Sequence, residues 1–467
     1  MRTRLARLAG VLAAACLLLP LSACDEILSV RNPAEIPVDS LGNAALLDAQ
    51  VAGLIARTAE VVSGTESAIV QAAAFMTDEQ LTGLNWEDWQ RTNQRIANYN
   101  EAQMDAMWSD MSEMVKLGEN ALRNLDTLAA DPTSDERVAL ASALTGYGYL
   151  FIGLHFCNAV FSTPDSLSGD LQQPTDVFQL AIPYFQDAID VGTAAGETDI
   201  VNLARVGMAR AHLNLGNWSQ AISFAGAVPA GFVWWVEFTD ADTDLYNNLY
   251  NEVTGANHTI GVHPAFLNGT YGDDGLVAGQ TDPRIQHASD NDTGHDGSTL
   301  LYKPYQGRRF SGYSGLTIAG GAVEEVDVIL FEQSTDVMLA DYVEAQHHMY
   351  EAMYRNGDPE GPILTFVNAR RAVGNEGPSA ATGAALFTEL RRQRARDTFM
   401  GGFRMGDLRR WGRQGVGNFF PTGAHPNPDR PPAIYGGWTC FPLPLEEYEG
   451  NPNLARPTDP LAPIVEF

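Results

Sequence analysis

Residues 201–229 constrain the fold more strongly than any other part of the chain. Their sequence, VNLARVGMARAHLNLGNWSQAISFAGAVP, predicts two short amphipathic helices joined by a turn at Leu215-Gly216-Asn217. Gly216 supplies the backbone freedom that a tight helix–helix turn needs. The first helix carries small residues that let a neighbour approach its backbone closely: Ala204, Gly207, Ala209 and Ala211. A single helical hairpin cannot bury its own apolar face, so other helices must stack on it.

The turn and the second helix resemble a tetratricopeptide repeat. Gly216-Asn217-Trp218 followed by Ala221 matches that part of the repeat, and Ala209 stands where the repeat has a small residue. An ordinary helical hairpin in an unrelated α protein is the alternative. We expect a mostly α fold, built on a tetratricopeptide-type helical scaffold with a large irregular insertion of loops and short strands.

Helical periodicity on both sides of this hairpin predicts a scaffold over residues 41–230 and 336–412. The predicted helices include 41–64, 91–128, 136–157, 177–191, 336–354 and 383–399, the last being Arg-rich on its predicted outer face. Residues 231–335 are rich in Gly, Asp, Asn, Thr and Tyr, which predicts an irregular insertion, and long insertions are often functional. Residues 413–467, rich in Pro and Gly, predict an extended C-terminal wrap. We interpret residues 24–467 as a single domain.

The amino terminus predicts export. Three arginines within the first seven residues precede an apolar run, residues 8–19, that is too short to span a bilayer. Residues 1–23 therefore read as a signal peptide. Leu21-Ser22-Ala23-Cys24 resembles the lipobox of bacterial lipoproteins, in which Cys24 would be acylated and become the first mature residue. The alternative is a soluble exported protein cut near Ala23. The lipobox interpretation predicts a protein held to a membrane by lipid alone.

The charge balance disfavours one class of partner. With 29 basic and 58 acidic residues, the formal net charge is −29, and such a surface repels phosphate backbones, so we expect no nucleic-acid binding. In an exported protein, Cys157 and Cys440 could form a disulfide. Cys157 could equally be a buried thiol, and the sequence leaves both possibilities open.

Several further phrases, in order along the chain, resemble the SusD/RagB family of outer-membrane nutrient-binding lipoproteins. They are Asp25-Glu26 after the lipobox, Thr281-Asp282-Pro283-Arg284-Ile285, Leu339-Ala340-Asp341-Tyr342-Val343-Glu344-Ala345, Phe403-Arg404-Met405-Gly406-Asp407-Leu408-Arg409-Arg410-Trp411-Gly412, Phe441-Pro442-Leu443-Pro444 and Asn451-Pro452-Asn453-Leu454. Two positions depart from the family pattern. Gly401 stands where the family usually has an acidic residue before glycine, and Asp341 stands where it often has Glu. The resemblance implies a SusD-like scaffold, a cell-surface location and capture of a nutrient.

Motifs for catalysis or metal binding are weak. The sequence has no nucleophile elbow, no His-Glu-x-x-His and no phosphate-binding glycine loop. His347 and His348 near Glu351 read as solvated histidines rather than zinc ligands. Acidic loops at 240–244 and 290–297 match calcium loops only in part, so calcium binding there stays open. Arg404 and Asp407 are three positions apart and can pair on one helix face. We expect no catalytic residues, no cofactor and no resident metal.

Aromatic side chains among polar residues are the positive signal for a ligand. Sugar rings stack their C–H faces on Trp and Tyr, and their hydroxyls take hydrogen bonds from polar side chains. The predicted ligand-binding residues are Asn85, Trp86, Trp89, Tyr271, Tyr302, Tyr305, Arg308 and Tyr313. The alternative for Trp86 and Trp89, of equal weight, is that they anchor the helix that follows.

These observations predict a non-enzymatic, surface-exposed outer-membrane lipoprotein that captures an oligo- or polysaccharide, with peptide as a further possibility. By the family resemblance, it would deliver the ligand to a SusC-like TonB-dependent outer-membrane transporter. One alternative is a tetratricopeptide scaffold lipoprotein for outer-membrane assembly, which leaves the long aromatic insertion unexplained. A second is a lipid-anchored glycoside hydrolase. The sequence specifies neither the ligand nor which aromatic residues contact it.

Overall fold

The computed structural model describes most of the chain from residue 42 onward. The described residues are 42–96, 98–162, 168–255, 257, 259–267, 269, 274–277, 279–312, 330–427, 429, 433–459, 462–464 and 466–467. The predicted signal peptide, the predicted lipidation site Cys24, and two of the predicted ligand residues, Tyr271 and Tyr313, lie outside them.

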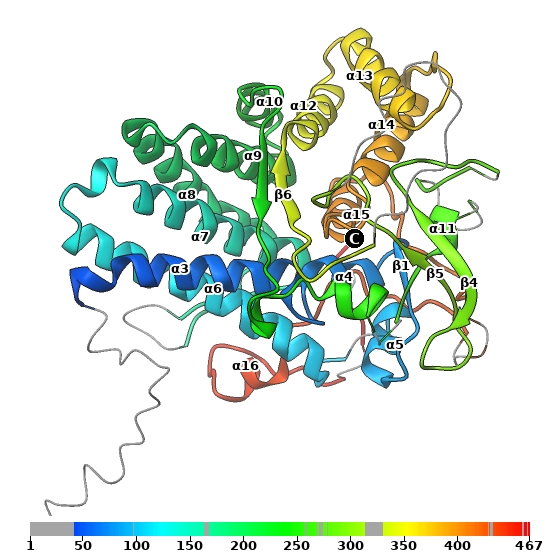
Figure 1. Cartoon of the computed structure of the whole chain (residues 1–467), viewed down its shortest axis with the longest axis horizontal. Helices are drawn as coiled ribbons and strands as arrows, with labels where there is room; N and C mark the ends of the chain where they lie inside the picture. Colours follow the sequence, from blue (N-terminus) through cyan, green and yellow to red (C-terminus); the bar gives the residue numbers. More distant parts are fainter. Residues whose placement is uncertain are drawn as a thin grey trace, which may run out of the picture.

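Helices dominate the described part of the chain (Figure 1). They are α3 (Leu47–Ala59), α4 (Ile69–Phe75), α5 (Glu87–Asn93), α6 (Ala102–Leu128), α7 (Glu136–His155), α8 (Pro174–Ala195), α9 (Thr198–Leu215), α10 (Trp218–Gly226), α11 (Pro264–Leu267), α12 (Tyr342–Asn356), α13 (Glu360–Val373), α14 (Gly383–Asp397), α15 (Arg404–Arg413) and α16 (Leu445–Glu449). Successive helices from α6 to α10 pack on one another, and α12 continues the array by packing on α10. The predicted mostly α fold is confirmed.

The hairpin predicted at residues 201–229 is present as α9 and α10. Gly216 ends α9 with φ +75°, the left-handed conformation that glycine adopts without strain. Gly207 shows why α9 needs small residues, since a Cβ there would lie 2.4 Å from the ring of Phe185 on α8. Helix α7 is long and apolar enough to cross a membrane, but 89% of its most apolar window is buried within the protein. It is the central helix of the array.

The described residues form three antiparallel strand pairs, two of which connect the insertion to the helical body. β1 (Gln80–Thr82) pairs with β3 (Ile260–Val262), and β2 (Val233–Val236) pairs with β6 (Val337–Asp341). β4 (His287–Thr293) and β5 (Leu300–Pro304) form a hairpin within the insertion. Figure 1 shows the hairpin and β1 on the side of the molecule away from α8. The predicted insertion of loops and short strands is therefore confirmed, and it lies beside the N-terminal residues 80–96.

Two predicted helices have different boundaries. The stretch 91–128 is broken, because α5 ends at Asn93 and α6 begins only at Ala102. Arg95 lies between them with φ +58°, and its buried guanidinium donates to the carbonyl of Trp438. The stretch 336–354 begins as strand β6, and the helix starts after Asp341, whose carboxylate accepts the N–H of Glu344.

Buried ion pairs hold the late helices together, contrary to three predictions. Arg404 and Asp407 do not pair with each other: Arg404 donates to Asp78 and Asp274, and Asp407 accepts from Arg394 and Arg410. Three of the four arginines of α14, Arg391, Arg394 and Arg396, are buried rather than on an outer face. We call the following residues the arginine cluster: Arg210, Arg284, Arg309, Arg394, Arg404 and Arg410, with Asp78, Asp274, Asp341, Glu344, Glu351, Asp397 and Asp407.

The two histidines of α12 are also buried rather than solvated. His347 contacts Asp397 at 2.8 Å and His348 contacts Glu344 at 3.0 Å, so carboxylates from the arginine cluster supply their polar partners. Burial lowers the pKa of His348 to about 4. The prediction failed because these partners come from tertiary packing and from the preceding turn of the same helix, which the spacing of the histidines did not reveal.

A disulfide joins Cys157, just after α7, to Cys440 in the C-terminal segment, with an S–S distance of 2.04 Å. The pairing that the sequence left open is thus present. Residues on either side also pair, since the N–H of Cys157 donates to the carbonyl of Phe441 and the N–H of Phe441 donates to that of His155. The C-terminal segment is therefore fixed to the end of the central helix.

Candidate functional site

The two adjacent tryptophans have different environments. Trp86 precedes α5 and is 48% exposed, beside the exposed Asn85. Trp89 lies one turn later and is fully buried, with its ring edge-on to Phe75 at 5.5 Å. In this arrangement Trp86 offers an apolar face to a ligand, whereas Trp89 anchors α5 to the core. Trp86 therefore stays a predicted ligand residue, whereas the burial of Trp89 fits the alternative that it anchors the helix.

The segment that carries Trp86 lies against the turn of the β4–β5 hairpin. The carbonyl of Gly83 accepts the N–H of Asp296 at 3.0 Å, and the two backbones touch at Gly83 and Gly294, where neither glycine leaves room for a Cβ. Trp86 is three residues from Gly83, which is at most about 11 Å of chain. The exposed indole and the hairpin turn therefore belong to one region of the surface.

A cavity of about 200 Å³ opens at this hairpin. Its apolar lining comes from β1, β3, α11, β5 and the C-terminal segment, and consists of Leu81, Val262, Pro264, Leu267, Leu300, Tyr302 and Pro426. Its polar side is formed by Ser298, Thr299 and Asn427. Asn427 donates to the hydroxyls of Thr299 at 2.7 Å and Ser298 at 3.0 Å, which fixes this polar edge. Tyr302 is thus the predicted residue that lines a cavity here.

Two further predicted residues within the described part of the chain, Arg308 and Tyr305, do not line this cavity. Arg308 forms an ion pair with Asp341 and belongs to the margin of the arginine cluster. Tyr305 is half-buried, and its N–H donates to the carbonyl of Gln286. Asn427 was missed because it lies in the Pro-rich tail, more than 120 residues from the hairpin in sequence. No local pattern connects the two segments.

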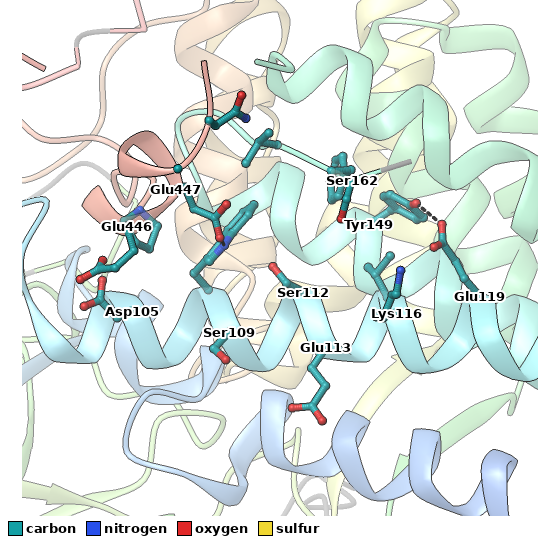
Figure 2. Close-up of a pocket in the computed structure, with 17 residues that line it drawn as sticks. Asp105, Ser109, Ser112, Glu113, Lys116, Glu119, Tyr149, Ser162, Glu446 and Glu447 are labelled. Atoms are coloured by element: carbon teal, nitrogen blue, oxygen red, sulfur yellow. Dashed lines mark hydrogen bonds between the residues drawn. The ribbon is translucent and has the colours of Figure 1, made fainter. Parts of the chain in front are cut away.

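A second, larger cavity of about 800 Å³ lies along α6, and no sequence motif pointed to it (Figure 2). One wall is the segment after α7, with Phe161 and Ser162, and the other is the C-terminal segment around α16. Figure 2 shows Ser112 and Lys116 of α6 pointing into the space between these walls, whereas Glu113 points away. We call this cavity the α6 groove.

Carboxylates are prominent in the α6 groove. Asp105 of α6 lies close to Glu446 of α16, and burial together with the charge of Glu446 raises the pKa of Asp105 to about 6. Glu447 accepts the indole N–H of Trp108 at 2.7 Å, and Glu119 accepts the hydroxyl of Tyr149 at 2.6 Å. The carboxylates of Glu447 and Glu119 therefore position the rings of Trp108 and Tyr149 in the groove.

The described residues contain no group of three or more His, Cys, Asp or Glu side chains placed to hold a metal ion. In the acidic loops considered for calcium, Asp242 accepts the N–H of Asp244, and Asp296 accepts the N–H groups of Ser298 and Thr299. The predicted loop at 290–297 lies partly outside this description, because the side chains of residues 289–292 are not described.

Comparison with known proteins gives a clear result for the fold. No protein-family model matches the sequence, and no curated protein sequence matches it. Among solved structures, a SusD-like protein from Bacteroides fragilis matches with a TM-score of 0.66 and 14% identity, covering 91% of this chain and 98% of that one. A SusD-like carbohydrate binding protein from Bacteroides fragilis matches with a TM-score of 0.61 and 13% identity over 89% and 99% of the chains.

A laminarin binding SusD-like protein also matches, with a TM-score of 0.56 and 14% identity over 89% of this chain and all of the other. Identities this low are informative about fold only. The matches cover about nine-tenths of this chain, so the resemblance is not confined to the tetratricopeptide-type hairpin. The chain has the fold of the SusD-like proteins.

Proposed function

We propose that the protein is a non-enzymatic lipoprotein of the cell surface that captures a glycan and delivers it to a TonB-dependent outer-membrane transporter. The observation that carries this proposal is the structural match over about nine-tenths of the chain to SusD-like proteins, several of them described as carbohydrate or sugar binding. The lipobox at Cys24 and the preceding signal sequence support the location.

The surface around Trp86 and Tyr302 is the candidate glycan site. The exposed indole of Trp86 provides a stacking face, and the cavity beside it combines Tyr302 with the hydroxyls and amide of its polar edge. Sugars need this combination, because their rings have apolar faces and polar rims. Tyr271, Tyr305, Arg308 and Tyr313 remain proposed contributors, and Trp89 is expected to act only through the position of α5.

Calorimetric titration of the soluble protein, residues 25–467, against a panel of oligosaccharides and polysaccharides that includes laminarin tests the proposal. Trp86→Ala should weaken the binding of a responsive glycan about tenfold or more, because a lost stacking contact removes on the order of 1–3 kcal/mol. Ile55→Ala is the matched control, since Ile55 is 46% exposed and its helix, α3, packs on α6 and α7 of the helical array.

Each incubation is also analysed for shortened sugars. Binding without cleavage supports capture, whereas turnover that isolated carboxylate variants abolish would instead indicate a hydrolase. Equal loss of binding in Trp86→Ala and Ile55→Ala would remove the proposed site but leave the capture function. Silence across the whole panel would oppose glycan capture itself.

Location and the transporter are tested separately. Protease added to intact cells should degrade the lipoprotein, and replacing Cys24 by Ser should release it from the membrane fraction. Co-purification with a TonB-dependent transporter is expected from cells that express both. Protection from external protease would favour the alternative of a periplasm-facing assembly scaffold.

A further inference from the structure

The α6 groove is longer than its main cavity. A second cavity of about 700 Å³ continues from it and shares Lys116, Glu119, Tyr149, Phe161 and Ser162 with the first. The lining runs along α6 from Asp105 to Arg123, which are 18 positions apart. At 1.5 Å per helical residue the groove is about 27 Å long. This length suits an extended chain rather than a single small molecule.

The described parts of the groove walls are held together within the protein. Glu447 accepts a hydrogen bond from Trp108 of α6. Asn451 donates to the carbonyl of Gly169 at 2.9 Å, which links the two walls. The disulfide between Cys157 and Cys440 holds the bases of both walls together. A preformed groove loses less conformational entropy on binding than one that must be ordered.

The groove carries more negative than positive side chains. Within the described part of the chain, five of its carboxylates are in no ion pair: Asp105, Glu119, Asp170, Glu446 and Glu447. Its two cationic side chains, Lys116 and Arg123, are likewise in none, so the groove keeps a net negative charge. Glu113 at its edge is already paired with Arg57. The crowded carboxylates would gain from a bound cation.

The groove is a poor platform for stacking sugars. Trp108 and Tyr149 are each only 5% exposed, and the partly exposed rings of Phe161 and Tyr184 pack against Tyr149. Its remaining polar groups include the Ser109, Ser112 and Asn451 side chains, which suit hydrogen bonds to a peptide main chain. The lining therefore favours a polypeptide with positive side chains.

The occupant must come from another molecule. Residues 25–41 of this chain carry four carboxylates and one arginine, and a second copy carries the same formal charge of −29, so both are repelled by an acidic groove. We propose that the α6 groove binds an extended, basic segment of a partner protein, about eight residues of which span its length at 3.3 Å per residue. This interaction surface is separate from the candidate glycan site at the β4–β5 hairpin.

A fluorescent ten-residue peptide in which lysine alternates with serine and glycine serves as the probe. It is titrated against the soluble protein by fluorescence anisotropy at low and physiological salt, beside a peptide with glutamate in place of lysine. Binding of the basic probe that weakens with salt is expected, and the acidic peptide should not bind. Absence of binding to the basic probe at low salt would overturn the proposal.

Matched charge variants separate the groove from the acidic surface as a whole. Asp105→Asn with Glu446→Gln removes two groove carboxylates and should weaken binding roughly tenfold. Asp126→Asn with Glu449→Gln removes the same charge from α6 and α16 at positions that do not line the groove, and should leave affinity nearly unchanged. Equal weakening by both pairs would show non-specific attraction and overturn the proposal.

A steric variant provides an independent measurement. Ser112 points into the groove in Figure 2, and Ser112→Trp should block the probe while leaving the net charge and glycan titration unchanged. Retention of full affinity would place the peptide elsewhere and contradict the proposal. A glucosamine oligomer that displaces the probe and binds more tightly than the peptide would instead assign the groove to a cationic glycan.

Discussion

The arginine cluster and the α6 groove both concentrate ionisable side chains, but the cluster pairs its charges, whereas most carboxylates of the groove are in no ion pair within the described residues. In the cluster, Arg404 reaches Asp78 at 2.8 Å and Arg410 reaches Glu351 at 2.7 Å, and all four side chains are buried. In the groove, Asp105 and Glu446 approach each other with no cation between them.

The difference separates structural charges from charges that are available for binding. A buried charge costs several kcal/mol of solvation unless a partner with good geometry offsets it, so the cluster must be complete to be stable. The groove is open to water, which reduces the cost of leaving carboxylates unpaired. Paired charges then position the insertion on the helices, and unpaired charges give the groove its attraction for cations.

Removal of one arginine from the cluster should have the largest effect. Arg404→Ala leaves Asp78 and Asp274 buried without their shared partner, which should reduce the free energy of unfolding by about 3–5 kcal/mol. Urea denaturation measures this reduction in the free energy of unfolding. Arg456→Ala is the control, because its pair with Glu449 is solvent-exposed and contributes about 0–1 kcal/mol. Similar losses in both variants would refute the distinction between the two kinds of charge.

Loss of the disulfide should rank second. Replacing Cys157 and Cys440 by Ser frees the C-terminal wall from α7 and should lower the free energy of unfolding by about 2–4 kcal/mol. The basic probe should also bind more weakly, since the groove is then less preformed. Unchanged peptide affinity in a clearly destabilised variant would show that the wall keeps its position without the bond.

Local patterns predicted the parts of the fold that local physics determines. The α9–α10 hairpin could be read from the sequence because its turn glycine and its spacing of small residues lie within 29 positions. The burial of arginines could not be read from the sequence, since arginine is usually exposed and each carboxylate that pairs with Arg404 is at least 130 residues away.

The same limit applies to the candidate site. Trp86 and Trp89 look alike in sequence. Only the folded structure shows that Trp89 is the buried one, packed against Phe75. Asn427 and the α16 carboxylates reach their sites through the folding of the C-terminal segment. Long-range packing therefore determines the site more than any motif does.

The pH dependence of stability should show opposite signs for two sets of carboxylates. Paired arginines hold the pKa of Asp407 and Asp397 well below the usual range, despite burial. Their stabilisation is therefore present above about pH 4 and lost as the pH falls. Burial raises the pKa of Glu79 and of Glu101 to about 8. Their contribution to the free energy of unfolding is therefore fully present below about pH 4.5 and lost as the pH rises through 8.

Stability should consequently reach a maximum near pH 5 and fall by roughly 2 kcal/mol towards pH 8. Denaturation curves across this range measure it. Glu79→Gln keeps an oxygen that can accept the N–H of Met400 but removes the titration, so it should flatten the alkaline side of the profile. A profile with the same alkaline slope in this variant would assign the loss to other groups.

The smallest effect is expected in the groove itself. Glu446→Gln removes a like charge from beside Asp105 and should raise the free energy of unfolding by about 0.2–0.5 kcal/mol at low salt. The pKa of Asp105, followed by carboxyl-carbon NMR, should fall below its value of about 6, because Glu446 is one of the causes of its increase. Glu449→Gln, which breaks an exposed pair on the same helix, should leave that pKa unchanged. If Asp105 titrates identically in all three proteins, burial alone raises its pKa, and the groove has less repulsion for a basic segment to relieve.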